Sequence, residues 1–269
     1  MSTVPSVRRP AAAAEPFVPR VSVIVPALNE ARNLPHVLDR LPHVDEVILV
    51  DGGSVDGTVE VARRLRPGIR VVTQNRRGKG NALACGLAAA SGDILVLIDA
   101  DGSTDPAEIP SFVAALRAGA DFAKGTRFSG RGGSADLTWL RRLGNRCLSL
   151  LVNLLFGTRY SDLCYGYNAL WAQHLDVFGL DSTSPPPTGR DGRRWGDGFE
   201  IETLLILRAA RAGLDIVEVP SFEAARIHGE SNLHAVRDGL RVLRTIAREW
   251  PRRAAARRAA AQRAKEHTR

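Results

Sequence analysis

Two aspartates separated by one residue, Asp99 and Asp101, directly follow an apolar run that ends at Ile98. Carboxylate oxygens are the ligands that hard divalent cations prefer, and two of them this close can share one ion. Such an ion can bridge the oxygens of a diphosphate and offset the charge that forms when the diphosphate leaves. Alternatively, the two acids only cap a turn and the next helix, at Pro106. The Asp-Ala-Asp pattern alone leaves both interpretations open.

Apolar runs without polar alternation, separated by helical patterns, precede these aspartates. They predict strands at Val21–Val25, Val47–Val50, Ile69–Thr73 and Ile94–Ile98, with helices over about 30–41, 57–65 and 80–90. This alternation predicts an α/β fold with a mainly parallel central sheet and helices on both faces. Such sheets bind ligands beyond the carboxyl ends of their strands. Because Glu30, Asp51, Asp99 and Asp101 all follow strand ends, we expect a site at that edge.

The second half of the chain has a more mixed pattern. We expect helices over Leu137–Phe156, Phe199–Ala212 and Ala235–Trp250, strands over Tyr165–Trp171 and Ile216–Val219, and a Pro/Gly-rich loop over 181–196. The arrangement predicts three parts: a flexible N-terminal segment over 1–20, a single domain over 21–250 and a basic Ala/Arg-rich tail over 251–269.

The distribution of charge argues against nucleic acid as a partner. The formal net charge is +8, but residues 252–269 hold seven Lys or Arg against one Glu, and residues 1–20 hold three Arg against one Glu. The body of the domain is therefore close to neutral and offers no basic face to a nucleic acid. Three widely spaced cysteines, Cys85, Cys147 and Cys164, form neither a disulfide framework nor a Cys-x-x-Cys metal site. We found no signal-peptide pattern and expect a cytoplasmic protein.

A series of motifs resembles glycosyltransferase family 2, whose members have the GT-A fold, a Rossmann-like nucleotide-sugar-binding architecture. These motifs span residues 25–30 (VPALNE), 50–58 (VDGGSVDGT), 78–80 (GKG), 99–101 (DAD), 125–127 (GTR), 162–167 (DLCYGY), 199–202 (FEIE) and 226–232 (RIHGESN). The set looks most like the dolichol- or polyprenyl-phosphate sugar synthase branch, and it covers residues 21 to about 245. The resemblance implies a metal-dependent hexosyltransferase that uses a UDP- or GDP-linked sugar as donor.

The resemblance also implies roles for residues at the matched positions. Asp51 would bind the nucleoside, although Gly52 replaces a second Asp common in that motif, which leaves the base open. Pro26, Ala27 and Glu30 would line the base and ribose pocket. The remaining donor contacts are expected from Lys79, Asp99, Ala100 and Asp101. Alternatively, Glu30 is a helix-terminal acid and Lys79 a solvated loop residue.

For the metal, the resemblance implies Mn²⁺ or Mg²⁺ held by Asp99, Asp101 and His228. Neutral imidazole is a suitable Mn²⁺ ligand, whereas the alternative is an ordinary loop histidine. Arg127 would contact phosphate, and Arg141, Arg142, Arg226 and Ser231 would face the acceptor phosphate. The basic stretch around Arg141 and Arg142 can equally be a solvated helix face.

Two acids are the main candidates for catalysis, and Asp197 is a competitor that could equally be the N-cap of the helix over Phe199–Ala212. Asp162 lies in a segment that in relatives faces sugar and acceptor, and Glu200 lies where GT-A enzymes often place a base. We expect Glu200 rather than Glu202, because residues two apart on a helix do not share a face. A lipid-phosphate acceptor is already ionised and needs no base, whereas an alcohol acceptor would need one. The lipid-phosphate relatives invert the anomeric centre, so we expect inversion.

Two other enzyme classes are excluded by their missing motifs, whereas the acceptor, the role of the tail and the oligomeric state stay open. A sugar nucleotidyltransferase would have a Gly-rich basic loop after the first strand, and a nicotinamide enzyme would have GxGxxG there; neither is present. A non-catalytic nucleotide-sugar-binding protein would be expected to lack the Asp-Ala-Asp acids. The acceptor is either polyprenyl phosphate or a soluble small molecule. Peripheral contact of the basic tail with the inner face of a membrane, and a homodimer, are open alternatives.

Overall fold

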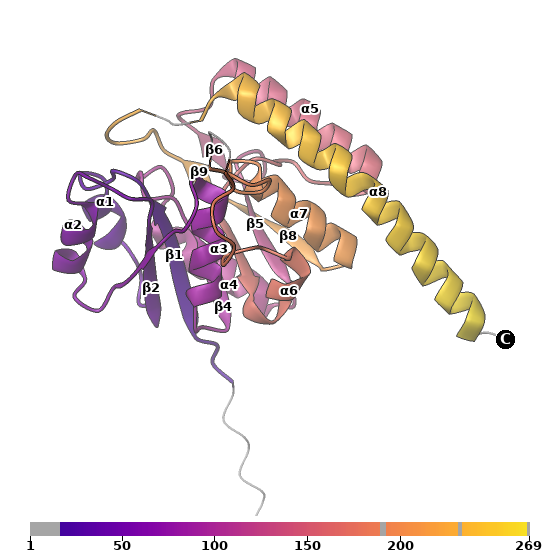
Figure 1. The fold of residues 1–269 in the computed structure, drawn as a ribbon, viewed down its shortest axis with the longest axis horizontal. Coiled ribbons are helices and arrows are strands. Elements are labelled where there is room, and N and C mark those ends of the chain that lie inside the picture. The colour runs from indigo at the N-terminus through magenta and orange to yellow at the C-terminus, as the bar shows by residue number, and fades with distance from the viewer. Residues whose placement is uncertain (1–16, 189–191, 231–232, 268–269) are drawn as a thin grey trace, which may run out of the picture.

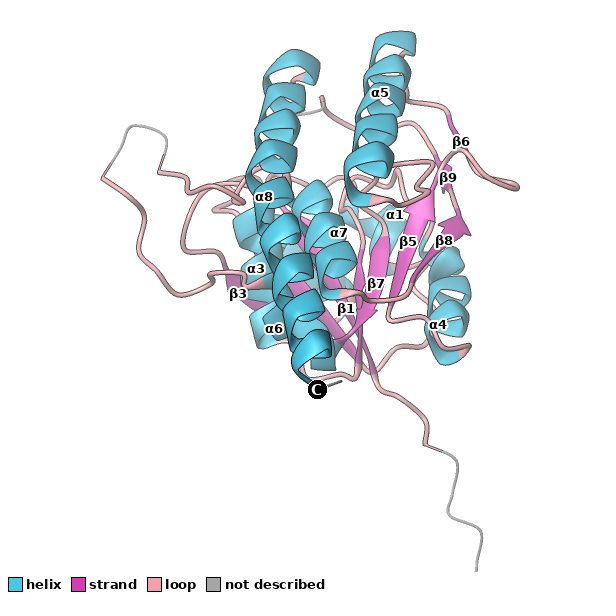
Figure 2. Ribbon diagram, turned by 90° about the vertical axis from the view of Figure 1, so that its right-hand side faces the viewer, coloured by secondary structure: helices cyan, strands magenta, loops and turns pink. Residues whose placement is uncertain are grey.

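The computed structural model describes residues 17–188, 192–230 and 233–267, with side chains described as far as Pro251. A seven-stranded sheet with the strand order β3-β2-β1-β4-β7-β5-β8 forms its centre (Figures 1 and 2). The strands are β1 (Val21–Ala27), β2 (Glu46–Asp51), β3 (Arg70–Thr73), β4 (Ile94–Leu97), β5 (Phe122–Thr126), β7 (Asn168–Trp171) and β8 (Ile216–Pro220). All pairs are parallel except those of β7, which runs antiparallel to both β4 and β5. The predicted mainly parallel sheet is confirmed.

Helices cover both faces because successive residues of each buried strand point to opposite sides. On β1, Val23 and Val25 belong to a core shared with α1 (Leu34–Leu38), α2 (Thr58–Leu65) and α4 (Ile109–Arg117). Ile24 belongs to a second core shared with α3 (Lys79–Ala89), α6 (Leu175–Phe178) and α7 (Ile201–Ala212). The apolar strand runs are thus explained by burial on both sides.

Two long helices form a third layer outside α7. They are α5 (Trp139–Phe156) and α8 (Ala235–His267), which run side by side (Figures 1 and 2). A separate core joins them to α7, with Val152 from α5, Ile206 and Leu207 from α7, and Val242 and Ile246 from α8. As α7 is covered on both sides, every residue from Ile201 to Ala209 is buried.

Smaller elements complete the chain. They are the 3₁₀ turns η1 (Pro106–Glu108) and η2 (Ala172–His174), and a two-stranded sheet of β6 (Gly133–Ser134) and β9 (Phe222–Glu223). No helix in the described part of the chain is both long and apolar enough to cross a membrane.

Candidate active site

A cavity of about 880 Å³ lies at the carboxyl ends of β1, β2 and β4, where the sheet was predicted to carry a site. The ends of these strands and the residues that follow them line the cavity, including Pro26, Ala27, Glu30, Gly52 and Gly53. The segment from β9 to the start of α8 and the first half of α5 form its other walls. The cavity is therefore built from both halves of the chain.

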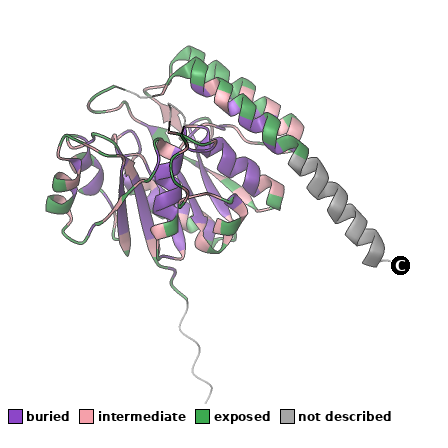
Figure 3. Ribbon diagram, in the orientation of Figure 1, coloured by how far each residue is buried: buried purple, intermediate pink, exposed green. Residues whose placement is uncertain are grey.

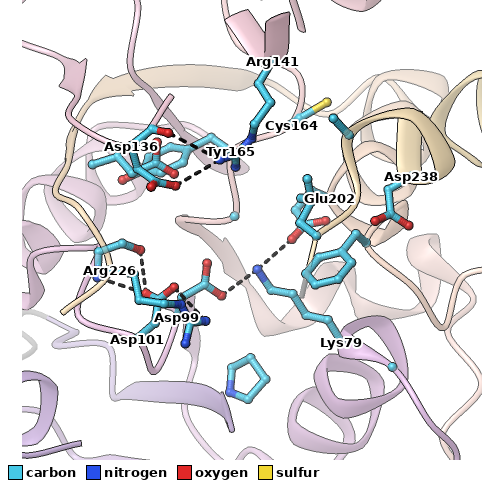
Figure 4. Close-up of a pocket in the computed structure, with 18 of the residues that line it drawn as sticks. Lys79, Asp99, Asp101, Asp136, Arg141, Cys164, Tyr165, Glu202, Arg226 and Asp238 are labelled. Carbon is cyan, nitrogen blue, oxygen red and sulfur yellow. Dashed lines mark hydrogen bonds and ion pairs between the residues drawn. The ribbon is translucent and has the colours of Figure 1, made fainter. Parts of the chain in front are cut away.

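Asp99 and Asp101 both face this cavity, and each meets a cation of the protein (Figure 4). The Lys79 ammonium lies 2.6 Å from Oδ1 of Asp99. The Arg226 guanidinium lies 3.2 Å from Oδ2 of Asp101, whose Oδ1 accepts hydrogen bonds from the main-chain N–H and hydroxyl of Ser103. The two carboxylates are thus oriented and charge-balanced at the edge of the sheet.

Lys79 also contacts a second acid, Glu202, at 2.8 Å (Figure 4). Burial lowers the pKa of Lys79, but the neighbouring charges of Asp99 and Glu202 outweigh it and raise that pKa above its ordinary value. Burial is also the largest influence on Glu202, and it raises the pKa of that carboxyl despite the Lys79 charge. Lys79 is therefore a firmly charged cation between two acids.

Arg226 forms the second bridge, from Asp101 to Glu30. Its guanidinium donates to Oε1 of Glu30 at 2.9 Å, while Asn33 donates to Oε2 of the same carboxylate. Burial raises the pKa of Glu30, and the hydrogen bonds of Asn33 and Arg226 oppose that rise. Residues almost two hundred positions apart in the chain thus meet across the cavity.

Arg127 lines the cavity and belongs to a buried ionic network behind it. It donates from Nε at 2.7 Å and from Nη2 at 2.9 Å to the two oxygens of Asp162, and from Nη1 to Glu223 at 3.0 Å. The guanidinium also lies over the Tyr165 ring, 4.8 Å from its centroid. Asp162 is completely buried and does not line the cavity, so its contact with the cavity lining is made through Arg127.

The two candidate acceptor arginines on α5 are placed differently. Arg141 lines the cavity and pairs with Asp136 at 3.0 Å. Arg142 is exposed outside it, with its guanidinium over the Phe128 ring. Helix α5 starts at Trp139, and the Thr138 hydroxyl caps it by accepting a hydrogen bond from the Arg141 N–H. In such a helix, successive side chains point about 100° apart. Only one of the pair can therefore face the site.

Three other predicted residues lie outside the cavity lining. The Asp51 carboxylate accepts hydrogen bonds from the main-chain N–H groups of Gly53 and Ser54, which orders the turn after β2. The Glu200 carboxylate accepts from the main-chain N–H groups of Gly196 and Gly198. Of the two acids, Glu202 lines the cavity and Glu200 does not, so the structure does not support our expectation that Glu200 faces the reacting groups, and its catalytic role stays a prediction.

His228 is the third. Its ring is 6.0 Å from the ring of His36, and its main-chain oxygen accepts from Asn33 at 3.1 Å. Among the described residues no three His, Cys, Asp or Glu side chains gather as a metal cage, so His228 does not join Asp99 and Asp101. Ser231 lies outside the described residues.

The donor set still fits Mg²⁺ or Mn²⁺. These hard ions take carboxylate oxygens, and Mg²⁺ is commonly held by one or two carboxylates together with substrate phosphates rather than by an all-protein cage. Asp99 and Asp101 supply such a pair, with Ala100 buried between them. The remaining ligand positions would fall to a diphosphate and water.

Sequence reasoning missed the apolar wall of the cavity. Leu137 just before α5, Leu140 and Leu148 on α5, and Val236 and Val242 on α8 line it. Our sequence analysis also gave Glu202 no role. Glu202 lies in the largely apolar run IETLLIL, which indicates burial, and a buried acid requires a charged or hydrogen-bonding partner. That requirement was the signal that could have identified Glu202.

Comparison with known proteins identifies the family. The model of Glycosyl transferase family 2 matches residues 22–176, more than half of the chain. The chain belongs to this family. An uncharacterised glycosyltransferase of Mycobacterium tuberculosis is 33% identical over 213 residues, covering 79% of this chain and 89% of the relative. The polyprenol monophosphomannose synthase of Mycolicibacterium smegmatis is 30% identical and covers 86% and 89%.

Solved structures agree with this family. Glucosyl-3-phosphoglycerate synthase from Mycobacterium tuberculosis, in complex with Mn²⁺, UDP and glucosyl-3-phosphoglycerate, superposes with a TM-score of 0.64 at 28% identity. The match covers 87% of this chain and 80% of that one. The predicted GT-A fold and transferase class are therefore confirmed, and the protein is a family 2 glycosyltransferase.

Proposed function

We propose that this glycosyltransferase moves a hexose from a UDP- or GDP-linked donor to a polyprenyl phosphate, with inversion at the anomeric carbon. The observation that carries the proposal is the two-sided cavity. One side holds Asp99, Asp101 and Lys79, and the other combines the apolar side chains of α5 and α8 with two acids paired to arginines, Asp136 with Arg141 and Asp238 with Arg241. An acceptor that is an anionic phosphate on an apolar chain is complementary to the second side.

The donor would bind on the side of the sheet. The base and ribose would lie against Pro26, Ala27 and the Gly52–Gly53 turn, which leaves the diphosphate near Asp99 and Asp101. A divalent ion held by these aspartates would offset the charge of the departing nucleoside diphosphate. Structures of the glucosyl-3-phosphoglycerate synthase contain UDP with Mn²⁺ or Mg²⁺, which supports the same ion here. Lys79 and Arg226 would add positive charge from the protein.

The acceptor would bind through Arg141. The pair of Arg141 with Asp136 is partly exposed, with side-chain exposures of 23% and 40%, and such pairs contribute little stability. The guanidinium can therefore exchange Asp136 for a phosphate at low cost. An acceptor phosphate oxygen then forms the new bond to the anomeric carbon, the bond from that carbon to the donor diphosphate breaks, and its electron pair leaves with the nucleoside diphosphate.

No proton has to be removed in this reaction, because a phosphate oxygen is already ionised. Asp162 and Glu202 then serve to position Arg127 and Lys79 instead of acting as a base. This role agrees with their contacts, since each carboxylate is bound to the cation it would orient. Relatives named undecaprenyl-phosphate mannosyltransferase, from Micrococcus luteus, and polyprenol monophosphomannose synthase support the same acceptor class.

A matched pair of variants tests the acceptor site. Arg141→Ala should raise KM for a short-chain, water-soluble polyprenyl phosphate about 10- to 100-fold, because it removes a charged hydrogen-bond donor to the phosphate. Arg142→Ala, its neighbour outside the cavity, should leave that KM unchanged. Equal effects of the two substitutions, or none, would contradict the assignment.

A soluble phosphate-bearing acceptor is the second candidate, favoured by the likeness to a synthase solved with glucosyl-3-phosphoglycerate. The same kinetic experiment separates the two. Transfer to a phosphate-bearing small metabolite, with no transfer to any polyprenyl phosphate, would replace the lipid acceptor by the soluble one.

A further inference from the structure

Helices α5 and α8 each carry an apolar stripe on the side that faces away from the domain. The stripe of α5 consists of Trp139, Leu143, Leu150 and Leu154, and that of α8 of Val236, Leu240, Leu243 and Trp250. All eight side chains are exposed, with Trp139 at 76% and Leu154 at 81%. Their spacing of three, four or seven residues aligns each set along one helix face. We call these eight residues the outer apolar face.

Folding does not require the outer apolar face. The opposite sides of both helices already pack on α7 through the third core, and Figure 3 shows the outward sides of α5 and α8 as mostly exposed, whereas their inward sides are buried or partly buried. The helices lie side by side, so the two stripes form one continuous surface. Monomeric proteins rarely leave so large an apolar patch uncovered unless it binds something.

The exposed charged side chains in the described parts of α5 and α8 are all positive. The exposed arginines are Arg142 and Arg146 on α5 and Arg237, Arg244 and Arg248 on α8. Helix α5 contains no acid. In the described side chains of α8 the two acids are buried and paired, Asp238 with Arg241 and Glu249 with Arg208 and Arg211.

This combination fits one kind of partner. Apolar stripes bordered by arginines are the pattern of helices that lie in the interface of an anionic bilayer, where leucine and tryptophan enter the headgroup layer and arginine meets lipid phosphate. A second copy of the chain, paired through the same face, would bring like charges together, which weakens association.

The face also leads into the active-site cavity. Leu140 and Val236 line the cavity and are themselves exposed, one on each of the two helices. We propose that the outer apolar face docks the enzyme on an anionic lipid surface and places the apolar wall of the cavity at the level of the lipid. This extends the proposed function, since a lipid phosphate could then reach Arg141 without leaving the bilayer.

Vesicle flotation of the full chain tests the docking. Wild type should float with phosphatidylglycerol-containing vesicles and much less with phosphatidylcholine alone. The double variant Leu150→Glu/Leu154→Glu, exposed and away from the cavity, should lose about tenfold or more in partitioning, because two anionic groups replace apolar contacts at a negative surface. The charge-matched control Val18→Glu/Val55→Glu, at exposed sites outside both helices, should bind like wild type.

Two outcomes would overturn the docking. One is undiminished flotation of the Leu150→Glu/Leu154→Glu protein, which would assign vesicle binding to the arginine-rich tail alone. The other is a wild-type dimer in sedimentation that this variant converts to monomer, which would assign the face to a second copy. Tryptophan fluorescence, to which the exposed Trp139 and Trp250 of this face contribute, should also be partly quenched by brominated lipids in wild type and in the control variant.

The assay separates this proposal from the acceptor assignment. With a short-chain, water-soluble polyprenyl phosphate, the Leu150→Glu/Leu154→Glu enzyme should turn over like wild type, and it should lose activity only toward long-chain acceptor in vesicles. Vesicle binding that depends on the face, without transfer to any lipid phosphate, would leave the docking intact and refute the acceptor instead.

Discussion

The acids of the site are balanced residue by residue by cations of the protein. Lys79 lies between Asp99 and Glu202, and Arg226 lies between Asp101 and Glu30. Partly buried carboxylates need such partners, because an unpaired charge away from water is costly. The two aspartates that we propose as metal ligands are therefore held in place by cations of the protein, and a donor diphosphate would attract the same cations toward its own oxygens.

The pair of Arg127 and Asp162 should be important for stability. Asp162→Asn leaves the buried guanidinium without its main counter-charge, so we expect a loss of about 3–5 kcal/mol in the free energy of unfolding near neutral pH. Urea denaturation measures this loss. A cost below about 1 kcal/mol would show that Glu223 alone can hold Arg127.

The same pair predicts how this loss depends on pH. Burial would raise the pKa of Asp162, but the hydrogen bonds of Arg127 and the charge of Lys124 outweigh it and hold that pKa below its ordinary value. An aspartate in an unfolded chain has a pKa of about 3.9. Because the pKa of Asp162 is lower in the folded protein, the ionised carboxylate stabilises the folded state fully above that pH. This stabilisation is lost as the pH falls through the pKa of Asp162 in the folded protein. The stability difference between wild type and Asp162→Asn should therefore be constant above about pH 5 and shrink in acid.

At the level of elements, α3 begins where another segment packs against its first turn. The N–H of Gly80 donates to the main-chain oxygen of Asp197 at 2.8 Å, and Arg76 pairs with the Asp197 carboxylate at 2.9 Å. A Cβ on Gly80 would lie 1.8 Å from the main-chain oxygen of Gly196. The glycines around Lys79 thus admit this segment and fix where Lys79 points.

Gly80→Ala should consequently push the 196–198 segment away and displace Lys79. We expect a drop of about tenfold or more in kcat/KM for the donor, together with a loss of stability from the broken contact. Gly68→Ala, where an added Cβ meets nothing within 4 Å, is the matched control and should behave like wild type. Full activity of the Gly80→Ala enzyme would contradict the argument.

Elements with strong local signals could be predicted from the sequence. The buried strands β1, β2 and β4 and the helices α2, α3, α5 and α7 lie within a few residues of their predicted bounds. The helix expected over about 30–41 is only Leu34–Leu38, with Pro35 in its first turn. Helix α8 continues to His267 rather than ending at Trp250. The antiparallel insertion of β7 between β4 and β5 depends on long-range pairing, which spacing does not reveal.

The candidate site could be predicted only in part, because its geometry also depends on contacts between residues far apart in the sequence. Strand ends located Asp99 and Asp101, and the motifs located Glu30, Lys79, Arg127, Arg141 and Arg226, all of which line one cavity. Whether Glu200 or Glu202, or Arg141 or Arg142, faces that cavity depends on how α7 and α5 are rotated by packing in the third core. The rotation of a helix that is set by tertiary packing cannot be predicted from residue types alone.

At the scale of the whole molecule, we propose that the sheet edge binds a nucleoside diphosphate and that the two outer helices contact lipid. The most direct test incubates the full-length enzyme with labelled UDP- and GDP-hexoses, Mn²⁺ or Mg²⁺ and polyprenyl phosphate in anionic vesicles, and measures label in the lipid fraction. We predict a metal-dependent glycosyl polyprenyl phosphate that is lost when Asp101→Ala replaces wild type. Absence of labelled lipid with every donor, while wild type transfers sugar to a soluble acceptor, would contradict the account.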